Sequence, residues 1–130
     1  MKLRITEKTT LSELKEQFSC SFSGLSLEFT GGAFMPFDFD TPDYDQLVYD
    51  LMLEKCSVEI EFNELIKPSV IEDKLESLLK LRCEVYRKTG KLWAKVMRTD
   101  ERNLKEQQRL AEEALMQSLI ADALKYYQCS

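Results

Sequence analysis

Apolar and polar residues follow two regular spacings along the chain, and these spacings predict most of its elements. Apolar residues occupy every second position in 25–29 and 58–62, a period typical of half-buried strands. They recur every three or four positions in the segments that follow Thr10 and Ser69, a period typical of amphipathic helices. The predicted order is strand 2–5, helix from 11, strand 25–29, helix from 41, strand 58–62, helix from 69, hairpin 82–98 and a helix over about 100–127.

Helix starts are indicated by residues that accept hydrogen bonds from free backbone N–H groups. Thr10 is followed three residues later by Glu13, which is the pattern of a capping box. Ser69 and Glu72 repeat this pattern, and Thr41 precedes a proline suited to a first helical turn. Thr99 or Asp100 is expected to cap the last helix.

A β-hairpin is predicted around Thr89-Gly90, because glycine readily adopts the positive φ that a tight turn needs. A two-residue loop at this point places Tyr86 opposite Trp93 and Glu84 opposite Lys95. The aromatic and charged residues then share the outer face of the hairpin. The face predicted to meet the core comprises Cys83, Val85, Leu92, Ala94 and Val96.

Two segments, 2–29 and 57–86, have the same strand–helix–strand plan, which indicates an internal duplication. The alternative is that any two such units look alike. A helix that joins two strands favours a parallel crossover within one sheet. We therefore expect one α+β domain over 1–130, with a two-layer, mixed sheet of about five strands, helices mainly on one face and a long C-terminal helix.

Composition narrows the possible chemistry. The chain has 130 residues, a net charge of −5, four scattered cysteines and no histidine. The absence of histidine excludes Ser-His and Cys-His nucleophile pairs, and the dispersed cysteines make a zinc site improbable. No apolar run has the length of a membrane span, and the N-terminus lacks a secretory apolar region. We expect a cytoplasmic, non-enzymatic protein with reduced thiols, no cofactor and no membrane contact.

The acidic loop 38–45 raises the possibility of a metal site, because Ca²⁺ and Mg²⁺ bind oxygen ligands. Its spacing differs from that of an EF-hand, since Pro42 occupies a ligand position. The other interpretation is a helix N-terminus, whose dipole favours nearby carboxylates. A small metal-dependent enzyme that uses this loop is therefore the least favoured of three function hypotheses.

Charge is distributed unevenly along the chain. Residues 38–76 contain 12 acidic and 3 basic residues, a net of −9, whereas residues 80–109 contain 10 basic and 4 acidic residues, a net of +6. The basic hairpin could stack bases and neutralise phosphates, or bind an acidic protein surface, or lie open to solvent. The residues predicted to contact nucleic acid or a partner are Tyr86, Arg87, Lys88, Lys91, Trp93 and Lys95.

The last helix is polar in its first turns and becomes apolar around much of its circumference after residue 110. A helix that is apolar on most sides needs a second surface against which to bury them. The simplest supplier is another protein chain, most simply a second copy of this one. The predicted oligomer contacts are Leu115, Leu119, Ile120 and Leu124.

Three segments of the second half carry a resemblance to a known family. They read SVIEDKL at 69–75, VYRKTGKLW at 85–93 and TDERNLKEQQ at 99–108. They resemble the motifs TVxELExxF, FRKSGxxW and TDxxTLExQN of a family of small uncharacterised bacterial proteins of the Bacteroidetes type. Residues 8–18 and 27–29 resemble the N-terminal half of that family.

The resemblance covers most of residues 1–108, and this chain departs from it in a longer acidic loop and in the apolar helix beyond Leu110. It implies a duplicated β-α-β architecture and a bacterial cytoplasmic origin, and it supplies no catalytic residue. The leading hypothesis is a non-catalytic interaction protein that self-associates through its C-terminal helix. Nucleic-acid binding by hairpin 82–98 is the alternative.

Overall fold

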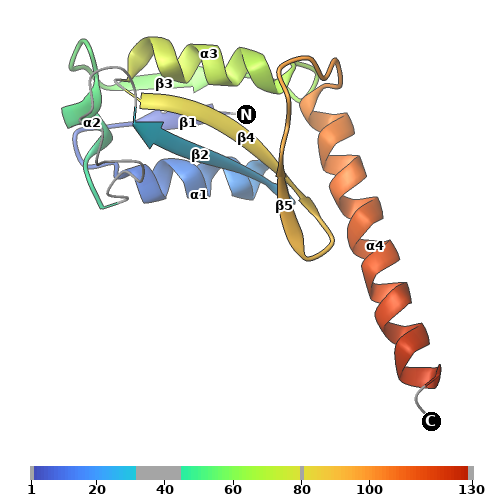
Figure 1. The fold of residues 1–130 in the computed structure, drawn as a ribbon. Coiled ribbons are helices and arrows are strands. Elements are labelled where there is room, and N and C mark those ends of the chain that lie inside the picture. The colour runs from blue at the N-terminus through green and yellow to red at the C-terminus, as the bar shows by residue number, and fades with distance from the viewer. Residues whose placement is uncertain (1, 32–44, 80, 129–130) are drawn as a thin grey trace.

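The computed structural model describes residues 2–31, 45–79 and 81–128. It confirms the α+β class and the predicted order of strands and helices (Figure 1). The elements are β1 (Lys2–Ile5), α1 (Leu11–Ser21), β2 (Leu25–Gly31), α2 (Val48–Leu51), β3 (Val58–Glu61), α3 (Pro68–Leu78), β4 (Leu81–Thr89), β5 (Leu92–Lys95) and α4 (Leu104–Gln128).

The five strands form two antiparallel sheets, so the prediction of one mixed sheet is wrong. β1 pairs with β3 in one sheet, and β2, β4 and β5 lie in that order in the other. Each β-α-β segment places its first strand in one sheet and its second strand in the other. The crossover therefore joins two sheets, and no parallel pairing is needed. Common origin of the two segments by duplication stays a prediction.

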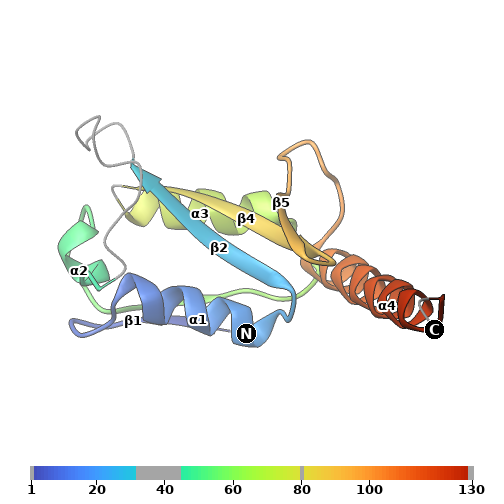
Figure 2. The ribbon, with the colours of Figure 1, turned by 60° about the horizontal axis from the view of Figure 1, so that its bottom comes forward.

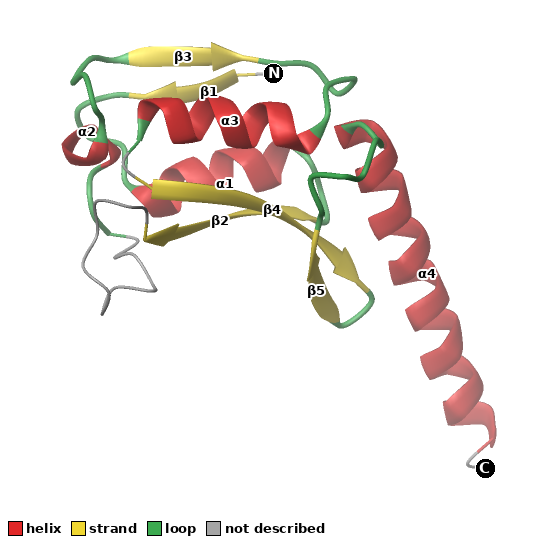
Figure 3. Cartoon of the chain, turned by 45° about the horizontal axis from the view of Figure 1, so that its top comes forward, coloured by secondary structure: helices red, strands yellow, loops and turns green. Residues whose placement is uncertain are grey.

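Helices α1 and α3 lie between the two sheets, as Figure 3 shows, and do not cover one face of a single sheet as predicted. The layers are therefore sheet, helices, sheet. Both sheets turn an apolar face inward, with Leu3 and Ile5 from one sheet and Leu25 and Leu27 from the other fully buried. Burial of these alternating residues fixes which face of each strand meets the helices.

The predicted apolar stripe of α1 is confirmed, because Leu11, Leu14, Phe18 and Phe22 are all fully buried. The rings of Phe18 and Phe22 have centroids 5.5 Å apart, and the ring of Phe22 is 5.7 Å from that of Phe62. These three aromatic residues connect α1 with the segment that follows β3. The core therefore continues from the helix layer to the β1–β3 sheet.

The start of α1 is as predicted, because Thr10 Oγ1 accepts a hydrogen bond of 3.2 Å from the N–H of Glu13. The predicted caps of α3 and α4 are wrong. Lys67 is the N-cap of α3 and makes no side-chain cap bond. Asn103, and neither Thr99 nor Asp100, caps α4, since Asn103 Oδ1 accepts from the N–H of Glu106 at 2.9 Å.

A helix is predicted from Thr41 onward. Within the described residues, the helix at this place is α2, which covers only Val48–Leu51. Its predicted start, residues 41–44, lies outside the described part of the chain. Val48, Leu51 and Met52 are buried, as the apolar stripe predicted.

The turn of the β4–β5 hairpin is centred one residue later than predicted. Thr89 pairs with Leu92, and Gly90 has φ +72° and precedes Lys91 in a two-residue loop. This is the arrangement of a type II′ turn, which requires a positive φ at its first central residue only. Every pairing is consequently shifted by two residues, so that Trp93 lies opposite Lys88.

A two-residue shift keeps each side chain on its predicted face. Cys83, Val85 and Val96 are buried as expected. Leu92 and Ala94 are exposed, contrary to the prediction, and Leu92 is 73% exposed. β5 is the edge strand of its sheet and extends past the buried layers (Figure 3).

Helix α4 packs on the body at its start and then extends away from it (Figures 1 and 2). Its first N–H groups, those of Leu104 and Lys105, donate to the carbonyls of Ile66 and Glu64, each at 2.9 Å. Leu104 and Ala111 are buried, whereas residues 119–125 are exposed. No helix in the described ranges is long and apolar enough to span a membrane.

Candidate functional site

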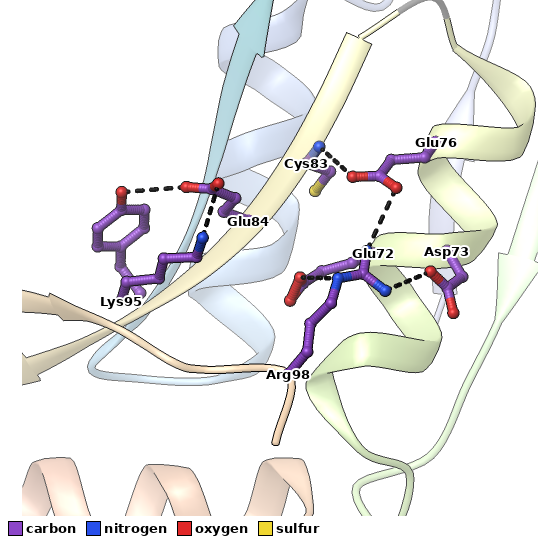
Figure 4. Close-up of polar contacts among 8 residues, drawn as sticks. Glu72, Asp73, Glu76, Cys83, Glu84, Lys95 and Arg98 are labelled. Atoms are coloured by element: carbon purple, nitrogen blue, oxygen red, sulfur yellow. Dashed lines mark hydrogen bonds and ion pairs between the residues drawn. The ribbon is translucent and has the colours of Figure 1, made fainter. Parts of the chain in front are cut away.

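A cluster of charged side chains lies where α3, β4, β5 and the connection from β5 to α4 meet (Figure 4). α3 contributes an acidic face beside its buried stripe of Ile71 and Leu75. The other elements contribute cations, a thiol and the carboxylate of Glu84. A hollow of about 420 Å³ at this point is lined by Glu72, Asp73, Glu76, Arg82, Cys83, Glu84, Lys95 and Arg98.

Arg98 ties the connection between β5 and α4 to the acidic face of α3. Its Nη1 is 2.7 Å from Asp73 Oδ1 and its Nη2 is 3.3 Å from Glu76 Oε2. Its Nε is 3.9 Å from Glu72 Oε2, which is close enough for attraction but too long for a hydrogen bond. One guanidinium thus holds three carboxylates of a single helix.

Glu72 is the buried member of the cluster, with only 1% of its surface exposed. Its Oε1 is buried and has no hydrogen-bond partner among the described residues. Burial raises the pKa of this carboxyl from its ordinary 4.5 to about 7, while attraction to Arg98 opposes the shift and the neighbouring Glu76 and Glu84 add to it. A group with this pKa can hold or release a proton near neutral pH.

Cys83, on β4, lies beside Glu72 of α3 and is also buried. Burial raises the pKa of its thiol well above the ordinary value, and the negative charge of Glu72 raises it further. Its backbone N–H donates to Glu76 Oε1 at 3.1 Å. The sulfur therefore stays a protonated thiol, which makes it a poor nucleophile.

The outer side of the cluster is formed by Glu84, which accepts from two neighbours. Lys95 Nζ donates to Glu84 Oε1 at 2.9 Å, and the Tyr86 hydroxyl donates to Oε2 at 3.2 Å. The hydrogen bond to Glu84 raises the pKa of Lys95. Burial and the negative charge of Glu84 raise the pKa of Tyr86. Both side chains therefore remain protonated at neutral pH.

The residues predicted to contact nucleic acid lie on or next to the hairpin. Several of their charged groups form ion pairs or hydrogen bonds with other side chains of the same chain. Lys91 Nζ is 3.6 Å from Asp122 Oδ1, and Arg87 Nη1 donates to Gln107. Lys88 Nζ lies 5.8 Å from the centre of the Trp93 ring, which is 49% exposed. The hairpin therefore presents one half-exposed indole with a lysine over it.

The residues predicted to mediate self-association are exposed on the distal half of α4. Leu115, Leu119, Ile120 and Leu124 are each 49–56% exposed, and Met116 is exposed at 58%. The tip of the hairpin contacts a different side of this helix, at Ser118 and Asp122. The apolar side has no partner among the described residues.

A second hollow, of about 290 Å³, lies between the start of β2, the hairpin and α4. It is lined by Ser23, Gly24, Lys88, Trp93, Ala111, Glu112 and Leu115. Its lining includes Leu115, one of the exposed apolar residues of α4.

Sequence reasoning missed both Glu72 and Arg98. Glu72 was assigned to a capping box with Ser69, but α3 begins one residue earlier and the side chain turns inward. Its position directly after Ile71 and three residues before Leu75 places it next to the buried stripe, and this spacing is the signal that could have identified it. Arg98 carries no comparable signal.

The acidic loop predicted to bind a metal lies outside the described residues, except for Asp45, which is exposed. Elsewhere, the described ranges contain no group of three or more cysteine, aspartate or glutamate side chains arranged to hold a metal ion.

Comparison with known proteins gives no relative. No protein-family model matches the chain, and no curated protein or solved structure matches it significantly. The resemblance to small bacterial proteins stays a prediction.

Proposed function

We propose that this chain is a non-catalytic interaction protein that self-associates through the distal half of α4. The observation that carries the proposal is the row of five large apolar side chains on this helix, each about half exposed. A contiguous exposed apolar surface of this kind is typical of a protein–protein contact. The five side chains are Leu115, Met116, Leu119, Ile120 and Leu124.

The surface spans half of the helix circumference. At 100° per residue, Leu115, Met116, Leu119, Ile120, Ala123 and Leu124 lie within 180°, whereas Ser118, Ala121 and Asp122 lie outside this sector. The hairpin contacts α4 at these two residues. A second helix can therefore dock without displacing the hairpin.

The order of the apolar residues favours a second copy of the chain as the partner. The apolar positions 115, 116, 119, 120, 123 and 124 are symmetric about the midpoint between Leu119 and Ile120. In an antiparallel pair, Leu115 lies opposite Leu124, Leu119 opposite Ile120, and Met116 opposite the small Ala123. A two-fold interface requires a surface that complements itself in this way.

The expected affinity is modest. Full burial of a large aliphatic side chain contributes about 1.5–3 kcal/mol, so covering a half-exposed one contributes about 1 kcal/mol. Ten such side chains per dimer contribute about 10 kcal/mol, against an association cost of about 4–15 kcal/mol. The smallest of these costs leaves about 6 kcal/mol, which corresponds to a dissociation constant on the order of tens of micromolar, so that measurements need hundreds of micromolar protein.

Replacing Leu119 by aspartate is expected to abolish self-association, because it places a charge at the centre of the proposed interface. The matched control is Gln117→Asp, which adds the same charge to an exposed position of the same helix outside the apolar sector. Sedimentation velocity would compare both variants with the unchanged chain. A protein concentration of about 100 µM is suitable, because it is on the order of the expected dissociation constant. A dimer that survives Leu119→Asp contradicts the proposed interface.

Nucleic-acid binding through hairpin 82–98 stays an alternative hypothesis. Its support is the exposed Trp93 with Lys88 above its ring. The pairing of Lys91 with Asp122 and of Lys95 with Glu84 weakens it, because these cations are already partly neutralised.

A catalytic function has less support. The sequence has no histidine, and the buried Cys83 remains a thiol. Cytoplasmic location is part of the proposal and is consistent with the free cysteines Cys20, Cys56 and Cys83.

A further inference from the structure

The buried Glu72 carboxyl is a costly feature that neither the fold nor self-association explains. A buried carboxylate oxygen without a hydrogen-bond donor destabilises the folded chain, and the part of the chain that the structure describes supplies no donor to Glu72 Oε1. Arg98 does not remove this cost, because its Nε is 3.9 Å away from the other oxygen and its Nη atoms bind Asp73 and Glu76. This cost is smaller when Glu72 takes up a proton, because burial of a neutral carboxyl costs less than burial of a charged one.

We infer that Glu72 is a protonation switch that loosens the junction of α3, β4 and the β5–α4 connection as the pH rises through neutrality. Most of the charged groups that hold the junction together face Glu72. Asp73 and Glu76 flank it on α3, Arg82, Cys83 and Glu84 face it from β4, Lys95 faces it from β5, and Arg98 faces it from the connection (Figure 4). A new charge at Glu72 therefore acts on all four elements.

The direction of the effect follows from proton linkage. The folded chain keeps the Glu72 proton up to about pH 7, whereas the open chain releases it near the ordinary pKa of 4.5. Between these two values the folded state binds more protons, so a rise in pH favours opening. Above about pH 7 the carboxyl is ionised in both states, and opening becomes independent of its titration.

Cys83 provides a reporter within the junction. Its thiol is buried beside Glu72, so a thiol reagent reaches it only when the junction opens. The experiment uses the full chain with Cys20, Cys56 and Cys129 replaced by serine. The rate of labelling by an aromatic disulfide, divided by the rate for a short cysteine peptide at the same pH, gives the opening equilibrium.

The switch predicts that the opening equilibrium rises about tenfold between pH 6 and pH 8. Glu72→Gln is expected to remove this rise, because the amide does not titrate. Asp73→Asn is the matched control, since it removes another carboxylate of the Arg98 cluster and leaves Glu72 in place. The background is low because the chain has no histidine, the side chain that ordinarily titrates in this range.

An equal rise in the unchanged chain and in Glu72→Gln would overturn the inference, and so would a flat profile in the unchanged chain. If Glu72→Gln does not fold, carbon NMR of the Glu72 carboxyl in the unchanged protein decides the question. A titration midpoint near 7 is expected, and a midpoint near 4.5 contradicts the switch.

Discussion

Replacing Phe22 by alanine is expected to lower the free energy of unfolding by about 3–5 kcal/mol, the range for removal of a buried phenylalanine ring. Phe22 is fully buried, and its ring lies between those of Phe18 on α1 and Phe62 after β3. Its loss leaves a cavity where the helix layer meets the segment that follows the β1–β3 sheet.

Urea denaturation followed by circular dichroism would measure this change. Leu65→Ala is the control, because Leu65 is 67% exposed and its truncation is expected to cost less than about 0.5 kcal/mol. Similar losses for the two variants would contradict the position of Phe22 in the core.

Replacing Gly24 by alanine is expected to destabilise the fold by about 2–5 kcal/mol. Gly24 has φ +81°, where an L-residue costs about 1–2 kcal/mol. A Cβ atom would also lie 2.7 Å from the Cβ of Ala111, so α4 would have to shift, and overpacking of this kind costs about 1–3 kcal/mol.

Gly90→Ala separates the two contributions. Gly90 also has a positive φ, +72°, but a Cβ there would meet Ser118 Cβ at an ordinary 3.5 Å. Urea denaturation should therefore show a loss of only about 1–2 kcal/mol for this variant. Adding Ala111→Gly to Gly24→Ala should recover part of the loss, and no recovery would argue against the contact between β2 and α4.

The elements of this chain were predictable from sequence because they depend on local spacing. The alternation of Leu25, Leu27 and Phe29 and the cap at Thr10 require only neighbouring residues, and the structure confirms both. The exposure of Leu115 and Leu119 followed from the same kind of argument, since a helix apolar on most sides exceeds what one contact can cover.

The pairing of strands was not predictable in this way. Whether β2 pairs with β1 or with β4 depends on which residues distant in sequence meet, and a strand–helix–strand segment fits both arrangements. The predicted register of the hairpin was wrong because the position of Gly90 within the turn is ambiguous. Gly90 supports a turn as its first or its second central residue, and only the observed pairing of Thr89 with Leu92 distinguishes them.

The candidate site was the least predictable part of the molecule. A glutamate on a helix usually faces solvent, so Glu72 was assigned to a cap. Its burial depends on residues that are distant in the sequence. Cys83 on β4 lies 11 residues after Glu72, and Arg98 lies 26 residues after it. The local spacing places Glu72 beside the buried stripe of α3 but holds no information on these distant contacts.

Equilibrium sedimentation of the unchanged chain across a concentration series tests self-association most directly. The account predicts a mass that approaches twice the 15.2 kDa of the chain at hundreds of micromolar and falls toward 15.2 kDa on dilution. A mass of 15.2 kDa at every concentration would contradict it.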